Sequence, residues 1–265
     1  MTFRTDFLRI EPMDVYHATK GVISSHRLAT FRRCPLQYHQ KETGIIGDVD
    51  STAYLLGRGA HTLIVEGHEI FERQYAVGGP VNPNTGKVYG AGTKAYKEWA
   101  DVIGKPALTD DQYALLINMM EGVQRNEDAV TLLAAGVAEG VTRHVYGGLM
   151  AQARLDLLNP YYGIVDLKTC DDLTWFEQDA RRFEYVHQMA FYRAMVWLAI
   201  DEPVPVHLIA VEKKPPFRCG VWRIGTDALG LAQKENEAAI GRLKECIKQN
   251  VWPTGYEAVR VMDSI

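Results

Sequence analysis

Residues 153–169 read ARLDLLNPYYGIVDLKT, two short apolar segments separated by a turn sequence. Asparagine, proline and glycine are the residues that turns use, and Asn159, Pro160 and Gly163 lie between the two segments. The pattern predicts two antiparallel strands joined by a short loop. If the loop runs from Asn159 to Gly163, Leu158 faces Ile164, and the register places Asp156 directly opposite Asp166.

Asp166 is followed two positions later by Lys168, so the two side chains share one face of the strand, while Val165 and Leu167 point into the core. Opposed residues on paired strands have Cβ atoms about 4.5–5.5 Å apart. Two carboxylates at that distance repel each other unless a cation lies between them. Mg²⁺ or Mn²⁺ is the expected ion, and the backbone carbonyl of Leu167 is a further oxygen ligand.

Lys168 on the same face can position a water molecule and offset negative charge that develops on a phosphate. The Asp…Asp-x-Lys set therefore indicates phosphodiester hydrolysis. An acid-x-Lys triplet alone is weak, since about one or two occur by chance in a chain of this length. A second triplet, Glu212-x-Lys214, precedes two prolines and is interpreted as a solvated strand end. Surface charge on an edge hairpin remains the alternative interpretation of the first set.

The rest of the chain predicts an α/β (α+β) domain, in which a mixed central sheet with an antiparallel meander is flanked by helices and carries helical N-terminal additions. Residues 1–265 are expected to form a single domain, with 1–135 mostly helical and 136–265 holding the sheet core. Strands are expected within 137–169, at 204–212 and at 218–224. Helices are expected after Ser24 or Ser25 up to Pro35, then up to Gly44, and at 52–75, 93–103, 109–134, 183–200 and 226–249, with a loop at 78–92.

Composition limits the function classes. No apolar run of about 18 residues suggests a membrane span, and the N-terminus lacks the pattern of a secretory signal. The four cysteines are scattered without a CxxC pair, which favours a reducing, cytoplasmic setting over a disulfide or zinc framework. The net charge of −4 is unusual for a nucleic-acid-binding protein. Two local basic pairs, Arg32-Arg33 and Arg181-Arg182, either lie on solvent-exposed helix faces or form a DNA-binding surface (a DNA track). The segment GAGTK (90–94) lacks the order of a phosphate-binding loop.

Further motifs surround the Asp…Asp-x-Lys set. The next helix carries Gln188 and Tyr192 one turn apart, and an upstream helix contains GRGAH with His61. The N-terminal segment reads ISSHRLATFRRCPLQYHQK. In this order the motifs resemble the PD-(D/E)xK nuclease superfamily with its restriction-endonuclease-like core, in the RecB-like branch. The similarity is nearest to nuclease domains of the RecE type (exodeoxyribonuclease VIII) and spans essentially the whole chain. The segment ARLD stands where relatives often have Arg-Pro-Asp.

The resemblance implies a role for each of the matching residues. Asp156 and Asp166 would bind the metal, Lys168 would be catalytic, and His61 would be an additional ligand. Gln188 and Tyr192 would orient the lysine or the DNA strand. Three of these residues have an alternative structural interpretation. His61 can be a buried core histidine, and Gln188 and Tyr192 can be polar side chains packed on a buried helix. Glu139 is a weaker metal-ligand candidate and can equally be a surface strand residue.

The resemblance also implies a function, a Mg²⁺-dependent exonuclease of double-stranded DNA for which Mn²⁺ can substitute. Degradation from the 5′ end would leave 3′ single-stranded tails for phage-type homologous recombination, in a bacterial or phage-infected cell. Partners would be DNA ends, a single-strand annealing protein of the RecT type, and copies of the same chain in a ring. No iron–sulfur cluster is expected, because Cys34 could match the first ligand but Cys246 stands alone. The alternatives are a structure-specific or restriction-like endonuclease, or a catalytically inactive DNA-binding module.

Overall fold

A six-stranded mixed sheet forms the centre of the computed structural model, which describes residues 2–47 and 52–261. Its order is β1-β4-β5-β6-β7-β8, and every neighbouring pair is antiparallel except β6 and β7. The predicted meander and mixed sheet are therefore confirmed. The strands are β1 (Arg9–Ile10), β4 (Val137–Tyr146), β5 (Leu149–Asn159), β6 (Gly163–Cys170), β7 (Val206–Glu212) and β8 (Cys219–Arg223).

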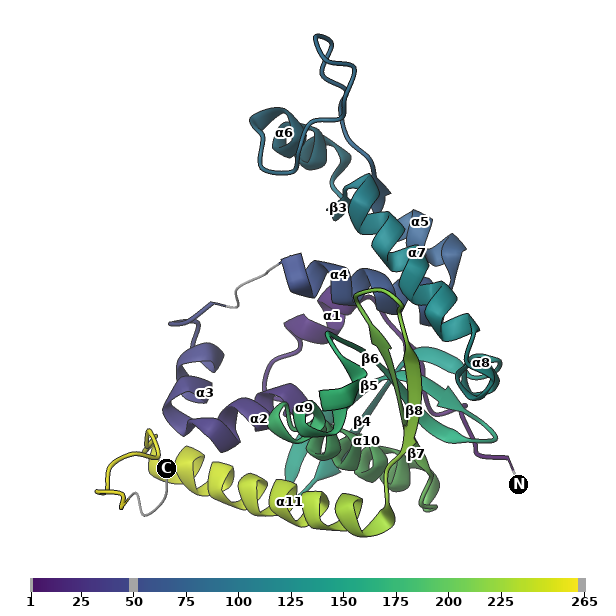
Figure 1. The fold of residues 1–265 in the computed structure, drawn as a ribbon. Helices are drawn as coiled ribbons and strands as arrows, with labels where there is room; N and C mark the ends of the chain where they lie inside the picture. The colour runs from purple at the N-terminus through teal and green to yellow at the C-terminus, as the bar shows by residue number, and fades with distance from the viewer. Residues whose placement is uncertain (1, 48–51, 262–265) are drawn as a thin grey trace.

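Helices cover both faces of the sheet, as Figure 1 shows. On one face α10, α11 and α2 pack on a core that includes Ile164, Phe191 and Ile240. On the other face α4 and α7 cover a core that includes Val165 and Leu167. The helices are α1 (Met13–Ala18), α2 (Ser25–Arg33), α3 (Pro35–Glu42), α4 (Thr52–His61), α5 (His68–Gln74), α6 (Lys94–Ile103), α7 (Asp110–Gln124), α8 (Glu127–Leu133), α9 (Phe176–Arg182), α10 (Tyr185–Ile200) and α11 (Thr226–Gln249).

Local sequence signals explain several helix boundaries. The Ser24 side chain accepts the Arg27 N–H at the start of α2, and Thr109 forms a capping box with Gln112 at the start of α7. The helix expected over 52–75 is instead α4, a π-helical turn (Thr62–Glu66) and α5, because Gly67 interrupts it with a left-handed φ of 93°. The helix expected over 109–134 divides into α7 and α8, since Asn126 caps the second helix through the Ala129 N–H.

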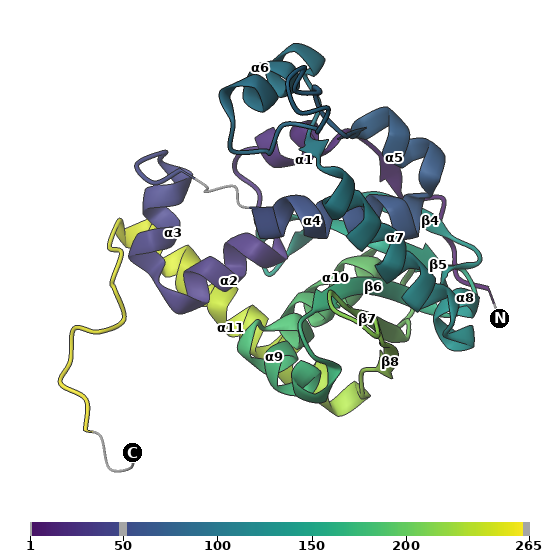
Figure 2. The same ribbon diagram turned by 45° about the horizontal axis from the view of Figure 1, so that its top comes forward.

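A narrow arm projects from the sheet between α5 and α7. Two short parallel strands, β2 (Ala76–Val77) and β3 (Ala107–Leu108), form its base. Beyond them the chain carries the predicted glycine- and proline-rich loop and α6, which stand away from the sheet in Figures 1 and 2. Among the helices of the described ranges, none combines the length and the apolar content that a membrane span needs.

Candidate active site

The hairpin formed by β5 and β6 lies in the middle of the sheet. Leu158 faces Ile164, as predicted, but regular pairing of β5 with β6 ends at Leu157 and Val165, one pair before the two aspartates. Here the Asp156 side chain replaces a strand carbonyl, since its Oδ2 accepts the Leu167 N–H at 2.8 Å. The predicted direct opposition of Asp156 and Asp166 is therefore corrected to a local opening of the two strands.

Three potential metal ligands meet at this opening. His61, Glu139 and Asp156 each offer an atom, and these atoms all lie within 4.8 Å of one another. His61 Nδ1 is 3.2 Å from Asp156 Oδ2. His61 is the last residue of α4, directly before the π-helical turn, a distortion frequent at functional sites. Two carboxylates and an imidazole form a donor set that suits a divalent cation.

Burial changes the protonation of these three groups. It lowers the pKa of His61, which favours the neutral imidazole that binds metals. Burial, followed by the negative charge of Asp166, raises the pKa of Asp156 well above its usual value. Burial, followed by the charge of Asp156, raises the pKa of Glu139 to about 7. A cation at this position would reverse both carboxylate shifts, so the shifts themselves fit a metal site.

Glu139 occupies an irregular position in β4. Its φ of 54° is left-handed, and the register of β4 with β5 passes from Ala138–Leu157 to Gly140–Leu155 without pairing it. Its Oε2 accepts a hydrogen bond from Arg154 Nε at 2.5 Å, and only 12% of its side chain is exposed. Glu139 is thus buried beside Asp156, and its interpretation as a surface strand residue is wrong.

Asp166 and Lys168 form a buried ion pair next to this cluster. Asp166 Oδ2 is 2.7 Å from Lys168 Nζ, and Asp166 is fully buried. Asp166 Oδ1 is buried without a hydrogen-bond partner in residues 2–47 and 52–261. A buried oxygen left in this way is costly unless a ligand satisfies it. Asp166 Oδ1 is therefore also a suitable ligand for a divalent cation.

Lys168 is held by residues of α10. Its Nζ donates to Gln188 Oε1 at 3.0 Å, and Gln188 Nε2 donates to the Tyr192 hydroxyl at 3.0 Å. The ammonium lies 4.8 Å from the centre of the Tyr185 ring, within cation–π range. Burial lowers the pKa of Lys168, but the charges of Asp166 and Asp156 more than offset this and raise it. The lysine is therefore cationic and fixed in position.

The structure thus brings together the metal-binding and catalytic side chains that the sequence indicated, namely His61, Glu139, Asp156, Asp166, Lys168, Gln188 and Tyr192. The Leu167 N–H donates to Asp156, and the role of the Leu167 carbonyl stays a prediction, as do the catalytic roles of the side chains. Two neighbours were missed. Arg154 is two positions before Asp156 in the quoted motif, and Tyr185 is three before Gln188 on α10, so spacing alone could have indicated both.

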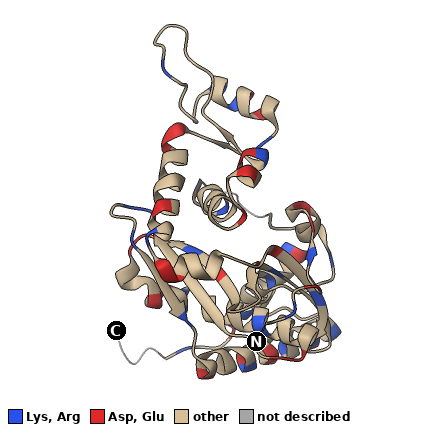
Figure 3. Ribbon diagram, turned by 90° about the vertical axis from the view of Figure 1, so that its right-hand side faces the viewer, with Lys and Arg blue, Asp and Glu red and all other residues tan. Residues whose placement is uncertain are grey.

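The four arginines proposed as a DNA track differ in their surroundings. Arg33, Arg181 and Arg182 are exposed. Arg32 is not, because its guanidinium pairs with Glu184 at 2.6 Å and donates to Asn236, and only 10% of its side chain is accessible. Arg32 is thus less suited than the other three to contact DNA. In the view of Figure 3, basic and acidic residues are interspersed along the ribbon.

The second acid-x-Lys triplet does not form a comparable site. Glu212 is buried, accepts the Leu173 and Arg218 N–H groups, and pairs with the Arg218 guanidinium at 2.5 Å. Its interpretation as a solvated strand end is wrong, because a turn after β7 returns Arg218 onto the carboxylate. Lys214 is exposed, as expected.

A mixed sheet covered on both faces, with Asp…Asp-x-Lys at an opening between two central strands, defines a PD-(D/E)xK nuclease fold. A family model described as "PDDEXK-like domain of unknown function (DUF3799)" matches residues 24–264. The chain belongs to this family. A comparison with curated proteins finds no match.

Two solved structures have similar folds to different degrees. A candidate exonuclease from Eubacterium rectale has 16% sequence identity and a TM-score of 0.70, with 97% of each chain covered. At this identity the likeness shows the fold alone. LHK-Exo in complex with dAMP has 13% identity and a TM-score of 0.33, covering 87% of this chain and 91% of that one. A TM-score this low supports no conclusion.

Proposed function

We propose that this protein is a metal-dependent exonuclease acting on double-stranded DNA, with Mg²⁺ as the metal and Mn²⁺ as a substitute. The observation that carries the proposal is the juxtaposition of the His61, Glu139 and Asp156 ligand atoms with the Asp166–Lys168 pair. Family membership supports phosphodiester hydrolysis, and the name of the Eubacterium rectale protein is consistent with an exonuclease.

The site residues divide into two groups by chemistry. Asp156 and His61, with Glu139, would hold the ion, and Asp166 would add its unpartnered Oδ1. A bound divalent ion would supply Lewis-acid stabilisation of the charge that develops on the phosphate. Lys168 would orient the attacking water and offset negative charge, while Gln188 and Tyr192 keep its ammonium in place.

The finer assignments rest on the resemblance to RecE-type nuclease domains. We propose degradation from the 5′ end, which leaves 3′ single-stranded tails for recombination of the phage type. A RecT-like annealing protein would receive these tails, and the enzyme would act in the cytoplasm. A ring of several copies would enclose the duplex and keep it bound despite a net charge of −4.

One experiment tests the proposal against its alternatives. Linear duplex, closed circular duplex and single-stranded DNA, each labelled, are incubated with protein and Mg²⁺. We expect release of nucleotides from linear duplex only, and no cleavage after addition of EDTA. Cutting of the closed circle would identify an endonuclease instead, and absence of metal-dependent cleavage on every substrate would indicate a non-catalytic module. Labels at the 5′ and the 3′ end report the polarity.

A further inference from the structure

Arg154 on β5 has hydrogen-bond donors that the fold does not use. Its side chain is 14% exposed, and its Nε donates to Glu139 Oε2 at 2.5 Å. Its Nη1 is buried and has no hydrogen-bond partner within residues 2–47 and 52–261. A buried charged donor without a partner is costly, so such a group in a folded protein calls for an explanation.

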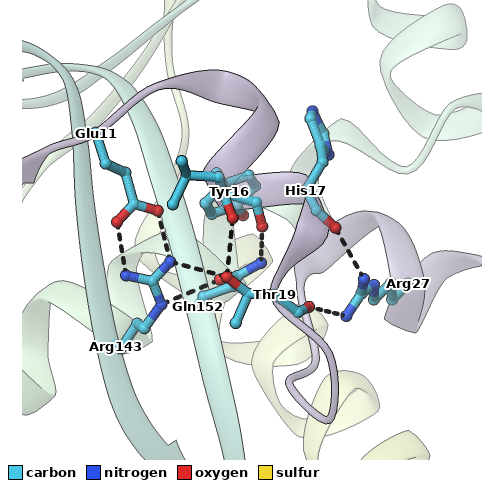
Figure 4. Close-up of polar contacts among 8 residues, drawn as sticks. Glu11, Tyr16, His17, Thr19, Arg27, Arg143 and Gln152 are labelled. Carbon is cyan, nitrogen blue, oxygen red and sulfur yellow. Dashed lines mark hydrogen bonds and ion pairs between the residues drawn. The ribbon is translucent and has the colours of Figure 1, made fainter.

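A second arginine, half-buried on the adjacent strand, provides the comparison. Arg143 reaches from β4 to Glu11, with its Nη1 and Nη2 donating to the two carboxylate oxygens at 2.9 and 2.5 Å (Figure 4). Its Nε donates to Gln152 at 3.2 Å, and Nη2 also lies 3.5 Å from the Thr19 hydroxyl. Every nitrogen of Arg143 has a partner, as expected for a structural arginine that fastens the N-terminal segment to the sheet.

The position of Arg154 indicates what its spare donors bind. Its only ion-pair partner among the described residues is Glu139, whose carboxylate belongs to the cluster that fits a metal. A cation bound to the Glu139 carboxylate would weaken the ion pair with Arg154. The hydrogen-bond donors of the guanidinium would then be available to an anion. Planar guanidinium groups bind phosphate oxygens through two parallel hydrogen bonds. The backbone holds Glu139 in a left-handed conformation, which is uncommon for residues other than glycine and recurs at active sites.

We propose that Arg154 binds a phosphate group of the DNA beside the metal, and that Glu139 retains the guanidinium until a divalent ion takes over its carboxylate. This inference rests on the proposed nuclease function and adds a residue that recognises the substrate. The phosphate is either the terminal monoester at a 5′ end or an internal diester, since both present the same oxygen chemistry.

The test measures two affinities of Arg154→Met, a substitution that keeps an unbranched side chain but removes the guanidinium. Fluorescence anisotropy of a labelled duplex is recorded with Ca²⁺ in place of Mg²⁺, with intact DNA verified on a gel. We expect duplex affinity to fall on the order of 10- to 100-fold, as for loss of a charge-assisted pair of hydrogen bonds. The slope of log affinity against log salt should decrease by about 0.9, one phosphate contact. Mn²⁺ affinity, measured by calorimetry without DNA, should rise, because Glu139 loses its competing partner.

Three controls make the outcome decisive. Arg154→Lys keeps the charge but not the paired donors, so duplex affinity should be intermediate. Arg143→Met, the same change on the neighbouring strand, should lower thermal stability and leave both affinities unchanged. Duplexes with a 5′-phosphate or a 5′-hydroxyl identify the phosphate: a loss confined to the phosphorylated duplex indicates the terminal monoester, and an equal loss indicates an internal diester.

Two results would overturn the role of Arg154. One is unchanged duplex affinity of Arg154→Met. The other is a parallel loss of duplex and Mn²⁺ affinity, which indicates a disturbed site rather than a lost phosphate contact. Cleavage of linear duplex by the unmodified protein in Mg²⁺ is assayed separately. Its absence would contradict the proposed nuclease function, whereas the affinities of Arg154→Met decide only the inference about Arg154.

Discussion

At the scale of single residues, the site is built from side chains that fit poorly into a metal-free interior. Asp156 and Asp166 lie close enough for the charge of Asp166 to raise the pKa of Asp156, and Asp166 Oδ1 has no hydrogen-bond partner among the described residues. Lys168 offsets only part of this negative charge. Buried charges that are incompletely paired reduce stability, so their presence in a core position points to function.

Lys168 is expected to matter for chemistry and not for binding of the metal. Lys168→Ala should lower the rate of linear-duplex digestion by at least about 100-fold, because it removes the cation that offsets developing negative charge. Mn²⁺ affinity, measured by calorimetry, should not decrease, since the two aspartates remain. Lys214→Ala changes the exposed lysine of the second triplet and should digest DNA normally. Normal digestion by Lys168→Ala would contradict the catalytic assignment.

Glu139 should give stability a pH dependence in the metal-free protein. Its folded-state pKa of about 7 is above the ordinary 4.5, so the folded state binds more protons between these values and loses stability as pH rises. Glu139→Gln removes this loss. Its unfolding free energy minus that of the unmodified protein should increase from pH 5 to pH 7 by at most about 1.4 kcal/mol per unit. Urea unfolding at each pH measures this difference. A difference independent of pH would refute the shift.

At the scale of elements, close packing decides where helices lie over the sheet. Gly122 in α7 lies against the turn after β7, and an added Cβ would collide with the Phe217 carbonyl oxygen. At Gly57 in α4, such a Cβ would have no neighbouring atom within 4 Å in the part of the chain that the structure describes. Both glycines are inside helices, where alanine is intrinsically favoured by about 1 kcal/mol.

The two glycines therefore predict opposite effects of one substitution. Gly57→Ala should stabilise the protein by about 0.5–1 kcal/mol through helix propensity. Gly122→Ala should destabilise it by about 1–3 kcal/mol, because a backbone oxygen cannot move aside as a side chain can. Equilibrium unfolding in urea measures both changes. Stabilisation by Gly122→Ala would show that α7 does not pack on the turn in this way.

At the scale of the whole molecule, charge and assembly are linked. The chain carries a net charge of −4, and Figure 3 shows acidic residues interspersed with basic ones. Counterion release alone is thus a weak source of DNA affinity. Light scattering after size exclusion should give a mass that is a small multiple of 29.8 kDa, as for a ring around the duplex. A single-chain mass at all concentrations tested would contradict enclosure.

Much of the fold and the acidic core of the site followed from local patterns. The turn residues between Leu158 and Ile164 determine the register of β5 and β6, and the apolar run of α10 predicts a helix buried on the sheet. The same patterns placed Asp156, Asp166 and Lys168 near one another. They could not show the break at Gly67 that ends one helix and starts another, since a glycine in a helical pattern is often tolerated.

The sequence by itself determined the three-stranded meander, the two later strands and the residue types of the site, because turn chemistry and the two-residue period of a strand act over a few positions. Only the tertiary structure decided that His61 meets Asp156, that Arg154 pairs with Glu139, and that Glu212 is buried. The first two contacts join residues of different helices and strands, and Glu139 depends on a left-handed backbone that no local preference predicts. Packing of α4 on β6 and pairing of β4 with β5 bring His61 and Glu139 to Asp156.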